Sequence, residues 1–187
     1  MASDTKHRIR LEVAARKAML SAEERLDAAR RVFDQLRSMA AFVMAERVLL
    51  YHSLPDELST REFLAEAPGG KQYYLPRVNG LDLEILPYDR TRMHLGAFRI
   101  EEPDGCDTVS VDDIDLIVVP AVAFDRQGNR VGRGKGYYDR LLSHARHAIT
   151  VGVGYGFQLY DSFEAEEHDI PLHFIIADGT TPFRGRR

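Results

Sequence analysis

The chain has 187 residues, with 25 lysines and arginines against 29 aspartates and glutamates, so its formal net charge is −4. This length suits one compact domain, and we expect a single domain over residues 1–187. The apolar content of 44% excludes wholesale disorder. The one cysteine, Cys106, excludes an internal disulfide and a cysteine-based zinc site. The mildly acidic total argues against a nucleic-acid partner.

No segment of the sequence is suited to export or to a membrane. The charged N-terminal segment lacks the apolar core of a secretory signal. The longest uncharged apolar run, 116–124, contains Pro120 and is far shorter than the roughly 20 residues that cross a bilayer. We therefore expect a soluble, cytoplasmic protein without a membrane partner.

The first half of the chain predicts two helices followed by strands. Apolar residues at helical spacing indicate a helix over residues 4–18, and Ser21 with Glu24 has the form of a capping box that opens a second helix. Thr60 is a candidate cap for a short helix. The elements expected next are a strand over 47–52, the short helix over 60–67, and strands over 72–75 and 83–86.

The second half predicts a buried sheet. Residues 87–113 carry Pro103, Gly105 and little periodicity, so we expect a long irregular surface excursion. The run 115–119 is continuously apolar and β-branched, as in a strand covered on both faces. A helix that starts near Gly136 and strands over 149–153 and 173–176 complete the pattern. Alternating strands and helices predict an open, largely parallel α/β sheet that binds ligands beyond the carboxyl ends of its strands.

The most informative segment is the run RVGRGKGYYD at residues 130–139. Glycines at alternate positions, Gly132, Gly134 and Gly136, let backbone N–H groups approach a ligand closely. The start of the following helix adds unpaired N–H donors, and Arg133 and Lys135 add positive charge. This combination predicts a site for an anion, most simply phosphate, against the alternative of a solvated basic turn.

The segment is not one of the two common phosphate loops. A Walker A motif needs glycine where Asn129 stands and Ser or Thr where Gly136 stands, and the dinucleotide fingerprint fails at Tyr137. A helix N-terminus contributes about 0.3–1 kcal/mol toward an anion, whereas micromolar nucleotide binding needs about 8 kcal/mol. The segment therefore needs partners elsewhere in the chain.

Candidate partners are scattered along the chain. Lys6 and Arg10 share a helical face, where like charges repel unless an anion lies between them; the residues alone favour a solvated face, and an anion site is the alternative. Asp139 lies one helical turn beyond the glycines, and Asp169 stands in a later acidic run, so both are candidate Mg²⁺ ligands. Glu57 follows a predicted strand, where a site is expected. His144 and His147 are most simply surface residues, and the sequence identifies no Ser/His/Asp or Cys/His catalytic set.

These motifs resemble the 5-formyltetrahydrofolate cyclo-ligases, also called 5,10-methenyltetrahydrofolate synthetases. The resemblance is carried by the block from Asp115 to Asp125 together with Gly128 to Asp139. Shorter matches extend it over nearly the whole chain: Lys6 with Arg10, 51–60, 75–77, Glu102 with Pro103, Gln158, and His168 with Asp169.

The resemblance implies a Rossmann-like three-layer α/β fold with helices on both faces of the sheet. It also implies an enzyme that uses ATP and Mg²⁺ to convert 5-formyltetrahydrofolate into 5,10-methenyltetrahydrofolate, with release of ADP and phosphate; we expect it to be a monomer. The residues that would contact ATP are Lys6, Arg10, Arg130, Val131, Gly132, Arg133, Gly134, Lys135, Gly136, Tyr137 and Tyr138. Those that would contact the folate are His52, Glu57, Phe98 and Tyr137. Asp139 and Asp169 would hold Mg²⁺.

The implied chemistry suits these residues. A formamide oxygen is a poor leaving group, so the expected course is phosphorylation of that oxygen, attack by N10, and departure of phosphate. Phosphoryl transfer depends mainly on positioning and charge stabilisation, and our hypothesis assigns these catalytic roles to Arg133 and Lys135. Two alternatives stay open: another ATP-dependent small-molecule phosphotransferase, and a non-catalytic folate- or nucleotide-binding protein.

Overall fold

The computed structural model describes residues 2–96, 101–166 and 169–187. Its helices are α1 (Ala2–Met19), α2 (Ala22–Ser38), α3 (Ala40–Met44), α4 (Arg61–Glu66) and α5 (Tyr137–His144). Its strands are β1 (Arg47–Leu49), β2 (Gln72–Asn79), β3 (Asp82–Pro87), β4 (Met93–Leu95), β5 (Glu101–Pro103), β6 (Leu116–Pro120), β7 (Ala123–Asp125), β8 (Arg130–Val131), β9 (Ile149–Gly154), β10 (Leu159–Tyr160), β11 (Phe174–Ala177) and β12 (Phe183–Arg184).

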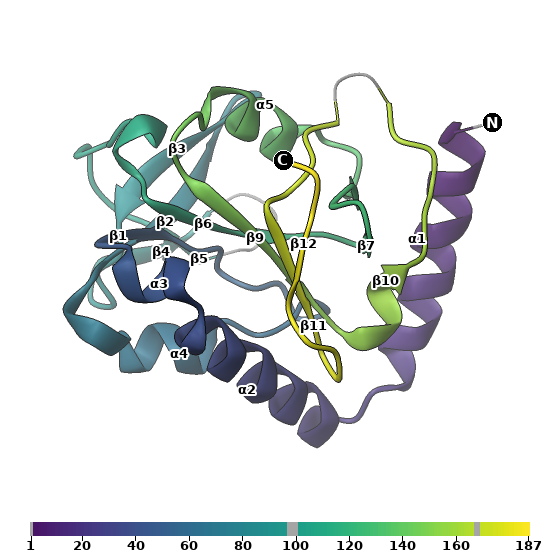
Figure 1. The fold of residues 1–187 in the computed structure, drawn as a ribbon. Coiled ribbons are helices and arrows are strands. Elements are labelled where there is room, and N and C mark those ends of the chain that lie inside the picture. The colour runs from purple at the N-terminus through teal and green to yellow at the C-terminus, as the bar shows by residue number, and fades with distance from the viewer. Residues whose placement is uncertain (1, 97–100, 167–168) are drawn as a thin grey trace.

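The main sheet has the strand order β12-β11-β9-β6-β1-β2-β3 (Figure 1). The five strands from β11 to β2 pair in parallel, and an antiparallel strand closes each edge. The prediction of a largely parallel α/β sheet is therefore confirmed. The β6 strand lies inside the sheet, which explains why its sequence is continuously apolar.

Helices cover both faces of this sheet. Successive residues of a strand point to opposite faces, so Val118 packs with the residues of α2, α3 and α4, whereas Val119 packs with Leu141 and Leu142 of α5. The predicted capping box is present at the start of α2, where Ser21 Oγ accepts from the Glu24 backbone N–H at 3.2 Å. The three-layer arrangement is confirmed.

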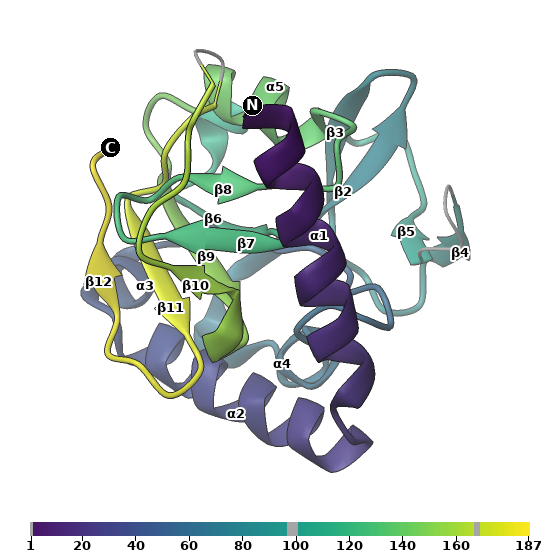
Figure 2. The same ribbon diagram turned by 90° about the vertical axis from the view of Figure 1, so that its right-hand side faces the viewer.

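A second, three-stranded sheet of order β10-β7-β8 connects α1 to the rest of the molecule (Figure 2). Ile9 and Val13 of α1 pack against Val122, Ala123 and Val131 of this sheet. The strands have two or three residues each, so they carry no periodic signal and the sequence did not predict them. By packing against α1, the small sheet places one face of this helix beside the end of β6.

Two local predictions were wrong. Residues 87–113 are not wholly irregular, because β4 and β5 pair antiparallel within them. Thr60 does not cap α4: its hydroxyl donates to the Tyr51 carbonyl at 2.7 Å, because burial requires that group to bond inside the protein. None of the helices in the described ranges combines the length and apolar character that a membrane crossing needs.

Candidate functional site

A pocket of about 940 Å³ opens where β1 and β6 end. Tyr51 and His52 follow β1, and Pro120 and Ala121 stand at the end of β6. These are the carboxyl ends of parallel strands, where open α/β sheets bind ligands. The other walls come from α1, from the residues of β2 and β3, from the start of α5, and from Glu166 and Asp169.

The pocket brings together nearly all the residues that the sequence singled out. Those that line it are Lys6, Arg10, His52, Glu57, Arg130, Gly132, Arg133, Gly134, Lys135, Gly136, Tyr137, Tyr138, Asp139 and Asp169. Val131 does not line it, because this residue of β8 buries its side chain between the small sheet and α1. Phe98 lies outside the described residues. Segments far apart in sequence thus meet in one place, which is what a ligand site requires.

The glycine-rich segment, residues 130–138, runs from β8 into α5. Gly134 and Gly136 have φ values of +91° and +69°, a left-handed conformation that favours glycine. Gly132 has no such backbone requirement, and a Cβ built on it would meet nothing within 4 Å. The fold therefore needs glycine at two of the three positions, and the open space beside Gly132 leaves room for a ligand to approach the backbone.

The cations around this segment differ in how they are held. Arg130 is buried and pairs with Asp139, while its other Nη donates to the Ile170 carbonyl at 2.6 Å. Arg10 Nε donates to the Gly132 carbonyl at 2.9 Å. The Lys135 side chain is exposed and makes no hydrogen bond or ion pair with any residue in the described ranges, although the Lys135 carbonyl accepts from Arg140 at 3.1 Å. Arg130 and Arg10 thus support the segment, and Lys135 is available to an anion.

The two candidate metal ligands lie on the same pocket wall as basic groups. Asp139 pairs with Arg130, and Asp169 Oδ2 lies 2.7 Å from Lys6 Nζ, which also contacts Glu166 at 3.0 Å. Within the described ranges no three acidic, histidine or cysteine residues cluster as a ready metal site. Mg²⁺ at a phosphate site needs only one or two carboxylates beside the phosphates, so the donor set fits that ion.

The β1 loop, residues 50–57, contributes His52 and Glu57. Glu57 accepts from the Leu54 backbone N–H at 3.0 Å and from Arg133 Nε at 3.2 Å. His52 lies 3.2 Å from Glu101, and its burial lowers its pKa below the usual value. His52 is therefore neutral near pH 7, and Glu57 connects the β1 loop to the glycine-rich segment.

The hydroxyl of Tyr138 is a buried polar atom without a partner. It makes no hydrogen bond to the residues that the structure describes, although Tyr138 lines the pocket. Burial, with the charge of Glu57 adding to it, raises the pKa of Tyr138, so the hydroxyl stays protonated. An unpaired buried donor costs about 1–3 kcal/mol, which a ligand with an acceptor in the pocket would offset.

Sequence reasoning missed three charged groups that belong to the pocket or its support. Glu102 is buried in the pocket wall and accepts from the Val78 backbone N–H at 3.2 Å. Lys17 and Asp56 join Arg133 in an ion-pair network. Two sequence features pointed to these residues, since Glu102 stood in a short family match and Lys17 shares a helical face with Lys6. Neither feature distinguishes a residue of the site from a solvated charge.

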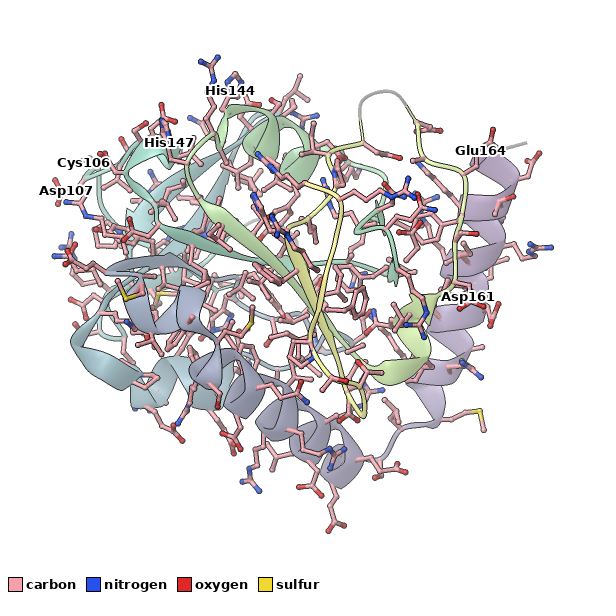
Figure 3. All side chains as sticks on the ribbon, viewed as in Figure 1. Cys106, Asp107, His144, His147, Asp161 and Glu164 are labelled. Carbon is pink, nitrogen blue, oxygen red and sulfur yellow. The ribbon has the colours of Figure 1, made fainter. Side chains whose placement is uncertain are left out.

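The residues that the sequence assigned to the surface lie there. Figure 3 shows His144 and His147 at the outer side of α5 and Cys106 at the periphery of the molecule. Cys106 is exposed and has a free thiol. None of these three side chains lines the pocket, so they take no part in the candidate site.

Comparison with known proteins gives consistent relatives. The model of the 5-formyltetrahydrofolate cyclo-ligase family matches residues 2–178. The chain is 30% identical over 173 residues to 5-formyltetrahydrofolate cyclo-ligase from Escherichia coli, which covers 88% of this chain and 95% of that protein.

Two solved structures are similar to the whole fold. The NMR structure of Aquifex aeolicus 5,10-methenyltetrahydrofolate synthetase matches with a TM-score of 0.87 and 33% identity, over 97% of this chain and 93% of that one. A 5,10-methenyltetrahydrofolate synthetase from Mycoplasma pneumoniae matches with a TM-score of 0.74 and 22% identity, over 91% and 97%. The second likeness concerns the fold alone.

Proposed function

The chain belongs to the 5-formyltetrahydrofolate cyclo-ligase family, and on that premise we propose that its pocket converts 5-formyltetrahydrofolate into 5,10-methenyltetrahydrofolate at the expense of ATP. The observation that carries this proposal is the meeting, in one pocket, of α1 cations, the glycine-rich segment, two carboxylates and the β1 loop. ATP would contact the cations and the glycine-rich segment. The folate would contact His52, Glu57 and Tyr137.

The reaction needs charge stabilisation more than a protein nucleophile. Transfer of the γ-phosphoryl group to the formyl oxygen breaks its bond to ADP and makes that oxygen a good leaving group. N10 then attacks the formyl carbon and loses its proton, and the C–O bond breaks as phosphate leaves with its electron pair. Arg133 and Lys135 would stabilise the transferring phosphoryl group, whose charge spreads over its oxygens.

Asp139 and Asp169 are the proposed Mg²⁺ ligands. Bound there beside the phosphates, Mg²⁺ would offset the negative charge of the phosphoryl oxygens. Both carboxylates are paired with cations, Asp139 with Arg130 and Asp169 with Lys6. These pairs hold the two carboxylates in place at the pocket wall. Direct binding of ATP should accordingly tighten when Mg²⁺ is added, and Asp139→Asn should weaken that response.

The open space at Gly132 and the unpaired Tyr138 hydroxyl also support the proposal. Neither feature serves the fold, since Gly132 has no positive φ and the Tyr138 hydroxyl bonds to none of the described residues. Both line the pocket beside Lys135. A bound phosphate chain would accept hydrogen bonds from the Gly132 backbone and from the Tyr138 hydroxyl, which explains both features together.

The direct test is an assay with ATP, Mg²⁺ and 5-formyltetrahydrofolate, followed by the absorbance of the methenyl product and by ADP release. We expect Lys135→Ala to lower turnover by roughly 10²-fold or more, because a preorganised cation is lost from the transition state. A decrease within about twofold would exclude that role for Lys135. ADP formed without the folate would indicate a different phosphotransferase, and binding without turnover would indicate a binding protein.

The single catalytic domain over residues 1–187, the monomeric state and the cytoplasmic location remain predictions. Sedimentation of the purified protein tests the monomer directly. A dimer that persists at nanomolar concentration would contradict it.

A further inference from the structure

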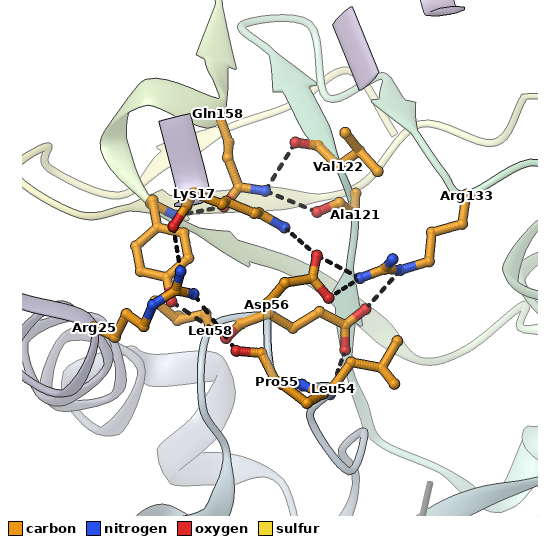
Figure 4. Close-up of polar contacts among 12 residues, drawn as sticks. Lys17, Arg25, Leu54, Pro55, Asp56, Leu58, Ala121, Val122, Arg133 and Gln158 are labelled. Carbon is orange, nitrogen blue, oxygen red and sulfur yellow. Dashed lines mark hydrogen bonds and ion pairs between the residues drawn. The ribbon is translucent and has the colours of Figure 1, made fainter. Parts of the chain in front are cut away.

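Lys17, in the last turn of α1, is a buried lysine outside the set assigned to the site. It is only 4% exposed, and its Nζ lies 3.4 Å from Asp56 Oδ2 (Figure 4). The same carboxylate accepts from Arg133 Nη2 at 2.6 and 2.8 Å. Lysine is almost never buried unless it is paired. Asp56 therefore joins a buried cation of α1 to a cation of the glycine-rich segment.

The helix geometry places Lys17 with the residues already assigned to the pocket. From Lys6, steps of four and eleven residues lead to Arg10 and Lys17, and both return to within about 40° of the same face. The three cations reach three different parts of the pocket wall. Lys6 contacts Asp169, Arg10 contacts the Gly132 carbonyl, and Lys17 acts through Asp56 on Arg133.

Arg133 is held on two sides by the β1 loop. Its Nη2 donates to Asp56 and its Nε donates to Glu57 at 3.2 Å. The side chain is half-exposed, and a long arginine without such partners would sample many rotamers in water. Glu57 is itself fixed by the Leu54 backbone. The two carboxylates thus set the direction of the guanidinium.

Lys17 decides how much of the Arg133 charge remains for a ligand. Asp56 and Glu57 carry two negative charges beside the two cations, so Lys17, Arg133, Asp56 and Glu57 together are neutral. Without Lys17, Arg133 and the two carboxylates would form a cluster with a net charge of −1 at the pocket. With Lys17, the carboxylates orient the guanidinium without making the cluster negative and repellent to a phosphoryl oxygen.

We propose that Lys17 and Asp56 are positioning residues: Asp56 directs the Arg133 guanidinium toward the phosphoryl group in the pocket, and Lys17 offsets the charge of Asp56. The proposal rests on the function proposed above. Neither residue needs to touch the substrate, and each acts through Arg133.

The first test replaces Lys17 with methionine, which keeps an unbranched apolar stem and removes the charge. We expect kcat/KM for ATP to fall about tenfold, because Arg133 is misplaced and the cluster around it becomes negative. The melting temperature should not fall, since replacement of a buried charge by an apolar residue of similar volume is often neutral or stabilising. Lys17→Arg, which keeps the cation, should stay within about threefold of wild type.

Lys71→Met is the matched control. Lys71 is a partly buried lysine whose Nζ donates to the Val43 and Ala45 carbonyls, and it does not line the pocket. Its replacement should leave kcat/KM unchanged. If Lys17→Met lowers the melting temperature while each folded molecule keeps wild-type turnover, Lys17 is a structural residue and the proposal is wrong.

A double-mutant cycle tests the connection to Arg133. In an Arg133→Ala background, Lys17→Met should change kcat/KM by less than about twofold, because residues that act through one another are not additive. Asp56→Asn should show the same dependence on Arg133. An equal, tenfold effect of Lys17→Met in both backgrounds would overturn the proposal.

A binding measurement separates this inference from the proposed reaction. Tripolyphosphate binding, measured by calorimetry, needs no turnover. Weaker binding in Lys17→Met, but not when Arg133 is already alanine, supports the positioning role even if the wild type forms no methenyl product. If the wild type is active and Lys17→Met has the same tripolyphosphate affinity and the same turnover as wild type, the positioning role is wrong while the proposed function stands.

Discussion

Helix α1 buries a lysine near each of its ends, and the two ammonium groups lie in different surroundings. Lys6 contacts both Asp169 at 2.7 Å and Glu166 at 3.0 Å. Burial lowers the pKa of Lys6, but the hydrogen bonds and charges of these carboxylates outweigh it, so its pKa lies above the usual value. At the other end, burial dominates and lowers the pKa of Lys17. Its one carboxylate, Asp56, is shared with Arg133.

The comparison shows that a buried charge can stabilise the folded state at one end of a helix and destabilise it at the other. At the Lys6 end, two carboxylates stabilise the ammonium, so the contact supports the folded state. At the Lys17 end, the folded state holds a charge that it only partly compensates. Partly compensated charges are found where function requires them, because selection keeps them in spite of their cost in stability.

The largest effect is expected from Lys6→Met. This change removes the ammonium that pairs with the Asp169 side chain at 2.7 Å, and removal of one partner of a buried pair costs about 3 kcal/mol or more. It also removes a proposed ATP contact, so KM for ATP should rise. Urea denaturation and steady-state kinetics measure the two effects. Wild-type stability in this variant would mean that the two ends of α1 do not differ.

Val13→Ala tests the apolar middle of the same helix. Val13 is fully buried against the small sheet. Loss of two methyl groups and the cavity that remains should cost about 2 kcal/mol of unfolding free energy. Val13 contacts no charged group of the site, so turnover of the folded protein should stay close to wild type. A large loss of kcat would show that the placement of α1, and not its cations alone, controls the reaction.

The pH dependence of stability distinguishes the two lysines. A lysine whose folded pKa lies below the unfolded value of 10.5 destabilises the folded state at neutral pH, and this effect disappears as the pH rises through the folded pKa. Lys17→Met should therefore gain relative stability at pH 7–8, and the gain should shrink toward pH 10.5. Lys6 should behave oppositely, since its contribution is present below 10.5 and is lost above it. Denaturation of each variant against wild type over this range is the measurement.

The smallest effect is expected from Arg30→Met on α2. Arg30 pairs with Glu62 of α4 at 3.0 Å, and both side chains are about half-exposed. Exposed pairs contribute little to stability, so the unfolding midpoint of the variant should stay close to that of wild type and turnover should be unchanged. A loss comparable to that of Lys6→Met would show that burial does not decide the value of these ion pairs.

Local patterns in the sequence predicted the elements whose physics is local. The apolar run of β6 and the capping box at Ser21 were found because burial and hydrogen bonding over a few residues produce them. The glycines at 134 and 136 were recognised as conformational requirements, and both have positive φ. The strands of the small sheet were missed, since strands of two or three residues gain their stability from neighbours far away in sequence.

The residues of the candidate site likewise fall into those that the sequence could predict and those that it could not. The glycine-rich segment and its partners Lys6, Arg10, Asp139 and Asp169 could be named from residue type and spacing, and by family resemblance. Lys17 could not, because it stands between Arg16 and Ala18 in a charged helix and looks like a solvated residue. Its role depends on Asp56, which lies 39 residues away. No local sequence pattern predicts that these two side chains meet in the folded protein.

The sequence by itself determined a predominantly parallel α/β sheet, a basic glycine-rich turn before a helix, and the family. These follow from periodicity, glycine conformation and motif, which act over short ranges. Only the tertiary structure decided that one face of α1 points into the pocket and that Asp56 lies between two cations. It also decided that the ammonium groups of Lys6 and Lys17 have opposite pKa shifts. Burial and partners set the state of a charge, and both are created by chain segments that meet only after folding.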